Sequence, residues 1–279
     1  MKQEILQIDK KKFIKSLLPL FKVYSTPGNE DEMRDYLKKQ LKSIKKIDWS
    51  FDQTGNIIGE RNLKGQKQVI LNSHMDSWMN PVTPEYIKGL GYYPKQDAIT
   101  NPGFMIGCDD KVGIGIILFL LKNTDLDMKF IFTHCEEKGC IGVNNLDPKV
   151  YNNCLFAVTL DRANSGDIIQ TYLERKMISD EMVEKIGKLS NQTYKMSPGI
   201  FADTYHIAEY IPAFNLSVGY YNQHKKNDYV KIDEALNALQ LTYNLLLNKE
   251  EMAVNAEPEI ITEIDIALNN SFKLETILS

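Results

Sequence analysis

Three short apolar runs in this sequence lead into an acidic residue or a histidine, and this regularity narrows the folds open to the chain. The runs and the residues that follow them are 69–73 with His74, 129–133 with Glu136-Glu137, and 155–160 with Asp161. Runs of this kind are typical of buried strands. Strands that alternate with helices predict an α/β fold with a central mixed, mostly parallel sheet and helices on both faces. Ligands bind outside the strand ends of such sheets, so we expect these residues to meet at one edge.

Apolar periodicity and turn residues predict the remaining elements. The expected helices cover 11–24, 30–43, 114–121, 180–189, 203–209 and 233–247, and the further expected strands cover 47–51, 56–61 and 213–217. The proline-containing stretch 77–106 is predicted to be a long functional or mobile loop. We expect one domain over 1–279, with its core at about 11–248. The C-terminal extension 249–279 has no clear pattern.

Composition excludes several classes of function. The chain has 279 residues, of which 43% are hydrophobic and 25% charged, as in ordinary soluble globular proteins. A formal net charge of -4 gives no basic footprint, so nucleic acid is not an expected partner. No apolar run approaches the roughly 18 residues of a membrane span. The four cysteines form no C-x-x-C pair and the first residues are too polar for a signal peptide, which predicts reduced thiols and a cytoplasmic location.

Histidines and carboxylates near the expected strand ends have the chemistry of a metal site. The candidates are His74, Asp109, Glu137, Asp161 and His224. Imidazole and carboxylate oxygen suit zinc and its divalent neighbours. A single catalytic ion needs about three protein ligands, whereas five suit two ions if one carboxylate bridges them.

Two neighbouring acids fit supporting roles at such a site. Asp76 lies two residues after His74, so both side chains share a face of the strand and the carboxylate can orient the imidazole. Glu136 and Glu137 point apart in extended chain, so one can bind metal while the other accepts a proton. A solvated loop is the alternative for two adjacent glutamates. Cys108 and Cys135 are expected to be buried packing residues.

Five motifs occur in the order found in co-catalytic dinuclear zinc exopeptidases. They are His74-x-Asp76, Gly107-Cys108-Asp109-Asp110-Lys111-x-Gly113, Glu136-Glu137-x-Gly139, Leu160-Asp161-Arg162, and Gly219-Tyr220-Tyr221-Asn222-x-His224. The chain resembles peptidase T-like tripeptidases and the related zinc aminopeptidases over residues 11 to 248. The resemblance implies their α/β catalytic fold. Peptidase T-like enzymes insert a lid domain after the residue equivalent to Asp161, and the interval before His224 is too short for one.

The resemblance implies a role for each motif residue. His74 and Asp161 would hold one ion, Glu137 and His224 the other, Asp109 would bridge both, Asp76 would orient His74, and Glu136 would be the general base. Members of this family often carry a cis peptide after the bridging aspartate, so one is expected at Asp109-Asp110. The implied cofactors are two divalent ions, zinc first, with cobalt or manganese as alternatives.

The implied reaction is hydrolysis of the amide bond of short peptides, with Glu136 taking a proton from the attacking water. Substrate contacts are expected from Arg162, Asp203, Tyr220, Tyr221 and Asp228, each of which could equally be a structural residue. An N-acyl amino acid deacylase with the same site is the alternative enzyme. A non-catalytic metal-binding relative and a purely structural acid cluster are the alternatives without catalysis. The oligomeric state stays open.

Overall fold

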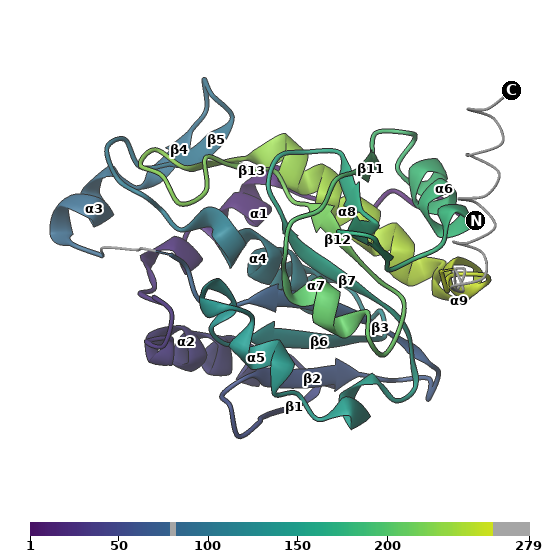
Figure 1. The fold of residues 1–279 in the computed structure, drawn as a ribbon. Coiled ribbons are helices and arrows are strands. Elements are labelled where there is room, and N and C mark those ends of the chain that lie inside the picture. Colours follow the sequence, from purple (N-terminus) through teal and green to yellow (C-terminus); the bar gives the residue numbers. More distant parts are fainter. Residues whose placement is uncertain (79–81, 259–279) are drawn as a thin grey trace, which may run out of the picture.

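An eight-stranded mixed sheet forms the centre of the structure, a computed structural model in which residues 1–78 and 82–258 are described (Figure 1). The strand order is β1-β2-β6-β3-β7-β12-β8-β11. The bounds are Asp48–Phe51 (β1), Ile57–Arg61 (β2), Gln68–His74 (β3), Met128–Thr133 (β6), Cys154–Arg162 (β7), Asp167–Ile169 (β8), Lys195–Ser197 (β11) and Ala213–Ser217 (β12). The central strands β6, β3, β7 and β12 run parallel, whereas the pairs β1–β2, β2–β6 and β12–β8 are antiparallel. The predicted mixed, mostly parallel sheet is confirmed.

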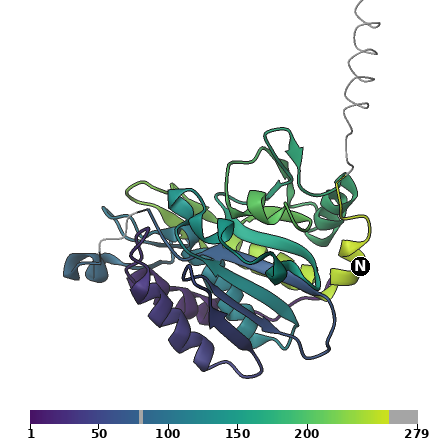
Figure 2. The same cartoon turned by 60° about the horizontal axis from the view of Figure 1, so that its bottom comes forward.

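Helices cover both faces of this sheet. One face carries α1 (Lys10–Leu17), α2 (Asp31–Lys42), α4 (Cys108–Asn123), α6 (Asp180–Leu189) and α8 (Ile232–Leu247), which contribute to the main apolar core. The other face carries α5 (Ile141–Asn144) and α7 (Asp203–Ile207) over a smaller core. In Figure 2 the purple N-terminal helices and the green segment near residue 200 lie on opposite sides of the sheet.

Strand β3 supplies both cores because successive side chains of a strand point to opposite faces. Val69 and Leu71 belong to the main core, whereas Ile70 belongs to the smaller one. Burial on both faces explains why this strand reads as a continuous apolar run.

The expectation of one long loop over 77–106 is wrong, because part of this stretch forms regular secondary structure. This stretch contains the helix α3 (Pro84–Gly89) and the strands β4 (Gly91–Tyr93) and β5 (Ala98–Thr100). The two strands join β13 (Tyr220–Tyr221) and β14 (Tyr229–Lys231) in a second sheet of order β13-β14-β5-β4. Three-residue strands are too short to show a periodic pattern, and the partner of β5 comes from much later in the chain. Residues 79–81 lie outside the described part.

Two predicted helices have different bounds in the structure. The helix expected over 11–24 ends at Leu17, and a 3₁₀ turn, Leu20–Lys22, follows Pro19. Leu18 keeps helical backbone angles, but Pro19 has no N–H to donate to the carbonyl of Lys15, which accounts for the break. The helix expected over 114–121 forms part of α4, Cys108–Asn123, whose start is interrupted at Asp109 and Asp110 by non-helical backbone angles. Of the extension 249–279, the described part contains α9 (Lys249–Ala253), and 259–279 lie outside it.

Amide side chains of α8 and of Asn248, the residue after it, bind the first residues of the chain. The pairs, backbone donor to side-chain acceptor, are Leu6 to Gln240 (3.0 Å), Glu4 to Asn244 (3.2 Å) and Lys2 to Asn248 (2.7 Å). Successive partners are four residues apart on the helix side and two residues apart in the N-terminal segment. These spacings match, because four helical residues rise roughly 6 Å and two extended residues span roughly 6.6 Å. Among the described residues, no helix has the length and apolar character needed to cross a bilayer.

Candidate metal centre

The carboxyl edge of the parallel strands gathers the predicted ligands. His74 is the last residue of β3, Asp161 lies at the end of β7, and Glu137 follows β6. Asp109 lies in the first turn of α4, and His224 lies in the loop between β13 and β14. Four separate segments and one helix start therefore converge, as expected for the ligand-binding edge of an open α/β sheet.

Two groups of three side chains have the spacing of metal ligands, and they share Asp109. In the first group, the Nε2 atom of His74 lies 2.9 Å from Asp109 Oδ1 and 3.4 Å from Asp161 Oδ1. In the second, the Nε2 atom of His224 lies 2.8 Å from Glu137 Oε1 and 3.4 Å from Asp109 Oδ2. The candidate ligand atoms of each group lie within 4.8 Å of one another. The two oxygens of Asp109 thus face different histidines, as a bridging carboxylate would.

The charges in this cluster favour cations. Burial and the nearby Asp109 raise the pKa of Asp161 to about 8. Hydrogen bonds to Asp109 and Glu137 raise the pKa of His224 to about 10. Both pKa shifts have the same cause, which is an excess of buried carboxylates. Such a site stabilises bound positive charge. Imidazole nitrogen and carboxylate oxygen are donors that zinc accepts, so the residues present fit such ions.

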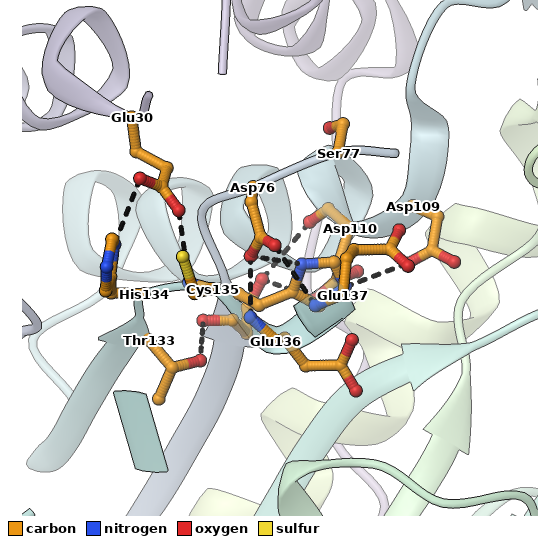
Figure 3. Close-up of polar contacts among 12 residues, drawn as sticks. Glu30, Asp76, Ser77, Asp109, Asp110, Thr133, His134, Cys135, Glu136 and Glu137 are labelled. Atoms are coloured by element: carbon orange, nitrogen blue, oxygen red, sulfur yellow. Dashed lines mark hydrogen bonds and ion pairs between the residues drawn. The ribbon is translucent and has the colours of Figure 1, made fainter. Parts of the chain in front are cut away.

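Asp76 links the first group to the loop that carries the adjacent glutamates (Figure 3). One of its oxygens lies 3.3 Å from His74 Nδ1. The carboxylate also accepts backbone hydrogen bonds from Glu136 (3.0 Å) and Glu137 (3.1 Å). Burial opposes ionisation of Asp76, but His74 and these N–H groups lower its pKa below the usual value. This carboxylate therefore fixes the ring of His74 and the start of the Glu136–Glu137 turn together.

The peptide bond between Asp109 and Asp110 is cis, so that prediction is confirmed. Asp110 is fully buried and belongs to neither of the two groups. It accepts hydrogen bonds from the hydroxyl of Ser73 and the backbone N–H of Gly113. Both contacts tie the start of α4 to β3 and to its own first turn.

Glu136 lies beside the two groups without belonging to either. It begins a 3₁₀ turn after Cys135, whose positive φ of 50° turns the chain sharply. Burial raises the pKa of its carboxyl well above the usual value, and the negative charges of Asp161 and Asp203 add to this. A raised pKa near the site is typical of groups that exchange protons during catalysis.

The five expected substrate residues divide into two sets. Tyr220 donates a hydrogen bond to Asp161 Oδ1 (3.2 Å), and Asp203 lies within ligand distance of Glu136. The other three contact protein groups elsewhere: Arg162 contacts Asp167, Tyr221 donates to Glu234, and Asp228 accepts the backbone N–H groups of residues 106–108. Asp228 is buried and holds the segment that leads to Asp109. A substrate contact by any of the five stays a prediction.

Two residues near the site were missed by the sequence reasoning. Trp78 stacks on His224, with ring centroids 5.6 Å apart, and its side chain is 52% exposed. A tryptophan two residues after Asp76 was a usable signal. Glu30 is fully buried and contacts His134 and the backbone N–H of Cys135, just before Glu136 (Figure 3). Nothing in its sequence context separates Glu30 from an ordinary helix start.

No protein-family model matches the chain. A curated protein of Bacillus subtilis (strain 168), YqjE, described as uncharacterized, is 31% identical over 156 residues, covering 50% of this chain and 40% of that protein. The match therefore spans less than half the length of this relative.

Solved structures of peptidases share the fold. A tripeptidase from Staphylococcus aureus superposes with a TM-score of 0.73 at 15% identity, covering 89% of this chain and 100% of that one. The aminopeptidase PepT from Bacillus cereus gives 0.74 at 17% identity, covering 88% and 99%. An aminopeptidase from the archaeon Desulfurococcus kamchatkensis gives 0.64 at 16%, covering 85% and 95%. The likeness to peptidase catalytic units that the motifs predict is confirmed at the level of the fold.

Proposed function

We propose that the chain is a dinuclear metal-dependent exopeptidase that hydrolyses an amide bond of short peptides, with an aminopeptidase as the specific assignment. The observation that carries the proposal is the shared position of Asp109 between two three-residue groups. The fold shared with a tripeptidase and aminopeptidases supports it.

In this proposal His74, Asp109 and Asp161 hold one divalent cation, and Asp109, Glu137 and His224 hold the other. Zinc suits these donors best, with cobalt and manganese as alternatives. When bound, two such cations supply Lewis-acid activation of water and of a substrate carbonyl near neutral pH.

Glu136 is the proposed general base. Its backbone is fixed by Asp76, while its side chain is left outside both ligand groups. It takes a proton from the attacking water and delivers it to the leaving amine. Tyr220 orients Asp161 through its hydroxyl, and Trp78 restricts the ring of His224 and forms an exposed wall beside it.

Replacing Glu136 with Gln tests this assignment. We expect hydrolysis of a tripeptide to fall by about 10²–10⁴-fold, because the amide cannot accept the proton. Metal content by elemental analysis should stay near two per chain. The matched control is Glu137→Gln at the next position, which should lose both metal and turnover. Undiminished turnover in Glu136→Gln would reject the proposed base.

A second assay separates peptidase from deacylase. The same metal-loaded protein is incubated with a tripeptide and with an N-acetyl amino acid, and released amino acid is measured. We expect faster cleavage of the tripeptide. Exclusive cleavage of the N-acetyl compound would reject the peptidase assignment in favour of the deacylase. The proposal places one catalytic domain, with its core at about 11–248, in the cytoplasm, which its four free cysteines support.

A further inference from the structure

A third group of possible ligands lies beyond Glu136, on the side of α7. It consists of Glu136, Cys140 and Asp203, whose candidate ligand atoms all lie within 4.8 Å of one another. Cys140 and Asp203 are each 1% exposed. Neither Cys140 nor Asp203 belongs to the two groups around Asp109, and neither of them has a role in the function proposed above.

One carboxylate oxygen of Asp203 has no hydrogen-bond partner in this third group. Its Oδ2 atom accepts hydrogen bonds from the Thr133 hydroxyl and from Asn72 Nδ2 (3.4 Å), which leaves the carboxylate held in one orientation. Its Oδ1 atom is buried and has no hydrogen-bond partner. A buried carboxylate oxygen without a partner is costly, and a second carboxylate nearby makes it more so. Among the described residues, no lysine or arginine forms an ion pair with Asp203 or Glu136.

The distance between Cys140 and Glu136 suits two ligands of one zinc ion. The Sγ atom of Cys140 lies 3.6 Å from Glu136 Oε1. Zinc bonds of about 2.3 Å to sulfur and about 2.1 Å to oxygen, at a tetrahedral angle, place the two donors about 3.6 Å apart. Three protein ligands and one water complete a common zinc geometry.

We propose that Glu136, Cys140 and Asp203 form a third divalent-cation site that binds excess zinc and inhibits the enzyme. Cys140 releases its thiol proton to solvent when the cation binds. Glu136 then donates its carboxylate to the cation and cannot accept a proton from water. Binding at this site is independent of the activity, whereas the inhibition rests on the proposed function.

The other cysteine-containing group is a weaker candidate. Glu30, His134 and Cys135 also have ligand spacing. However, Nη1 of Arg34 lies 3.3 Å from His134 Nδ1 and 3.8 Å from Glu30 Oε2. The guanidinium already supplies the positive charge there, and it would repel a cation. Cys135 is therefore a suitable control for Cys140.

Titration with Co²⁺ tests the site without relying on activity. Wild-type protein already holding two Co²⁺ per chain is titrated with further Co²⁺ and followed by absorption. A third equivalent should produce a thiolate-to-cobalt charge-transfer band in the near ultraviolet. Cys140→Ser should lose the band, whereas Cys135→Ser should keep it. Absence of the band in wild type, or its persistence in Cys140→Ser, would overturn the site.

Inhibition by Zn²⁺ supplies the second measurement. Tripeptide hydrolysis is measured against added Zn²⁺, relative to the two-metal activity of each variant. The half-inhibitory concentration should rise at least about tenfold in Cys140→Ser and in Asp203→Asn, since even outer contacts of a metal site contribute that much. An unchanged value in Cys140→Ser would overturn the inhibitory role. A protein that shows the cobalt band but hydrolyses no peptide would retain the third site and refute the proposed function.

Discussion

At the scale of single residues, Asp109 determines the geometry of the centre because its two oxygens face different histidines. Asp76 has a comparable double role, since it contacts His74 and the turn that carries Glu136 and Glu137. In each case one short carboxylate joins two segments that are distant in sequence. A change at either residue therefore disturbs more than one neighbour.

Lys111 gives a prediction about pH. Its side chain is fully buried, its Nζ donates to the carbonyl of Val23 (2.8 Å), and burial lowers its pKa to about 7. The unfolded chain keeps a lysine pKa near about 10.4, so between these values it binds more protons than the folded chain. Stability should then rise with pH from about 7, by up to about 1.4 kcal/mol per unit from this group.

The comparison of Lys111→Met with wild type isolates this effect. The variant should lack the rise, so the difference in free energy of unfolding between the two proteins should change steadily from pH 7 to pH 9. Urea titrations at each pH provide the measurement. Lys122→Met, on the same helix but partly exposed, is the control. The pH dependence of its free energy of unfolding should stay closer to that of wild type. Parallel pH profiles for wild type and Lys111→Met would contradict the prediction.

The convergence of His74, Glu137 and Asp161 could be predicted from the sequence because each lies at or just after the end of a central strand. Asp109 and His224 are joined to them by the order of the family motifs. Residues such as Glu30 and Trp78 could not be predicted, since their contacts with His134 and His224 depend on how distant segments pack. Asp228 is predicted to contact substrate because its carboxylate could hold the amino terminus of a peptide. In the structure its oxygens accept backbone N–H groups of residues 106–108, which lie 120–122 positions earlier in the chain, so no local pattern reveals the contact.

At the scale of elements, the close approach of α4 to β7 depends on a glycine. A Cβ atom on Gly113 would lie 2.3 Å from the carbonyl oxygen of Leu160, next to Asp161. Gly115 lies two residues later on the same helix. A Cβ atom on Gly115 would lie 2.1 Å from the end of the Leu17 side chain. A backbone carbonyl in a central strand cannot move aside, whereas a leucine side chain can change rotamer.

Gly113→Ala should therefore push α4 from the sheet and separate Asp109 from Asp161. We expect it to lose about 1–3 kcal/mol of stability and to bind metal more weakly. Gly115→Ala, the matched control, should keep its metal affinity even if it loses stability. Chemical denaturation and metal competition measure the two quantities. Equal metal affinity in both variants would show that the spacing of α4 does not control the centre.

The predicted elements that match the structure are those with a strong local pattern. The central strands at 69–74, 129–133, 155–160 and 213–217 are buried on both faces, which makes their apolar runs unmistakable. The second sheet was missed because β4 and β5 are short and the other two strands of this sheet, β13 and β14, lie beyond residue 219. Pairing over such a distance leaves no trace in either segment alone.

At the scale of the whole molecule, the two bound cations would tie β3, β6, β7, α4 and the His224 loop together. Removing them with a chelator should lower the free energy of unfolding, since ions that bind only the folded chain stabilise it. The loss should be about 2.7 kcal/mol per site when the free ion is at 100 times its Kd. Thermal unfolding with and without chelator measures it.

Asp109→Asn is the control for this measurement, because it weakens both sites at once. Its unfolding temperature should respond much less to the chelator than that of wild type. If wild-type protein unfolds at the same temperature in both conditions, the folded chain holds no stabilising cation and the acid cluster is structural.

The contacts between α8 and the opening residues of the chain have a consequence for biosynthesis. Glu4 and its partner Asn244 are separated by 240 positions. At translation rates of 5–20 residues per second, the first segment leaves the ribosome roughly 10–50 s before α8 exists. Throughout that interval its amide groups are open to chaperones and proteases, because their partners on α8 have not yet been made.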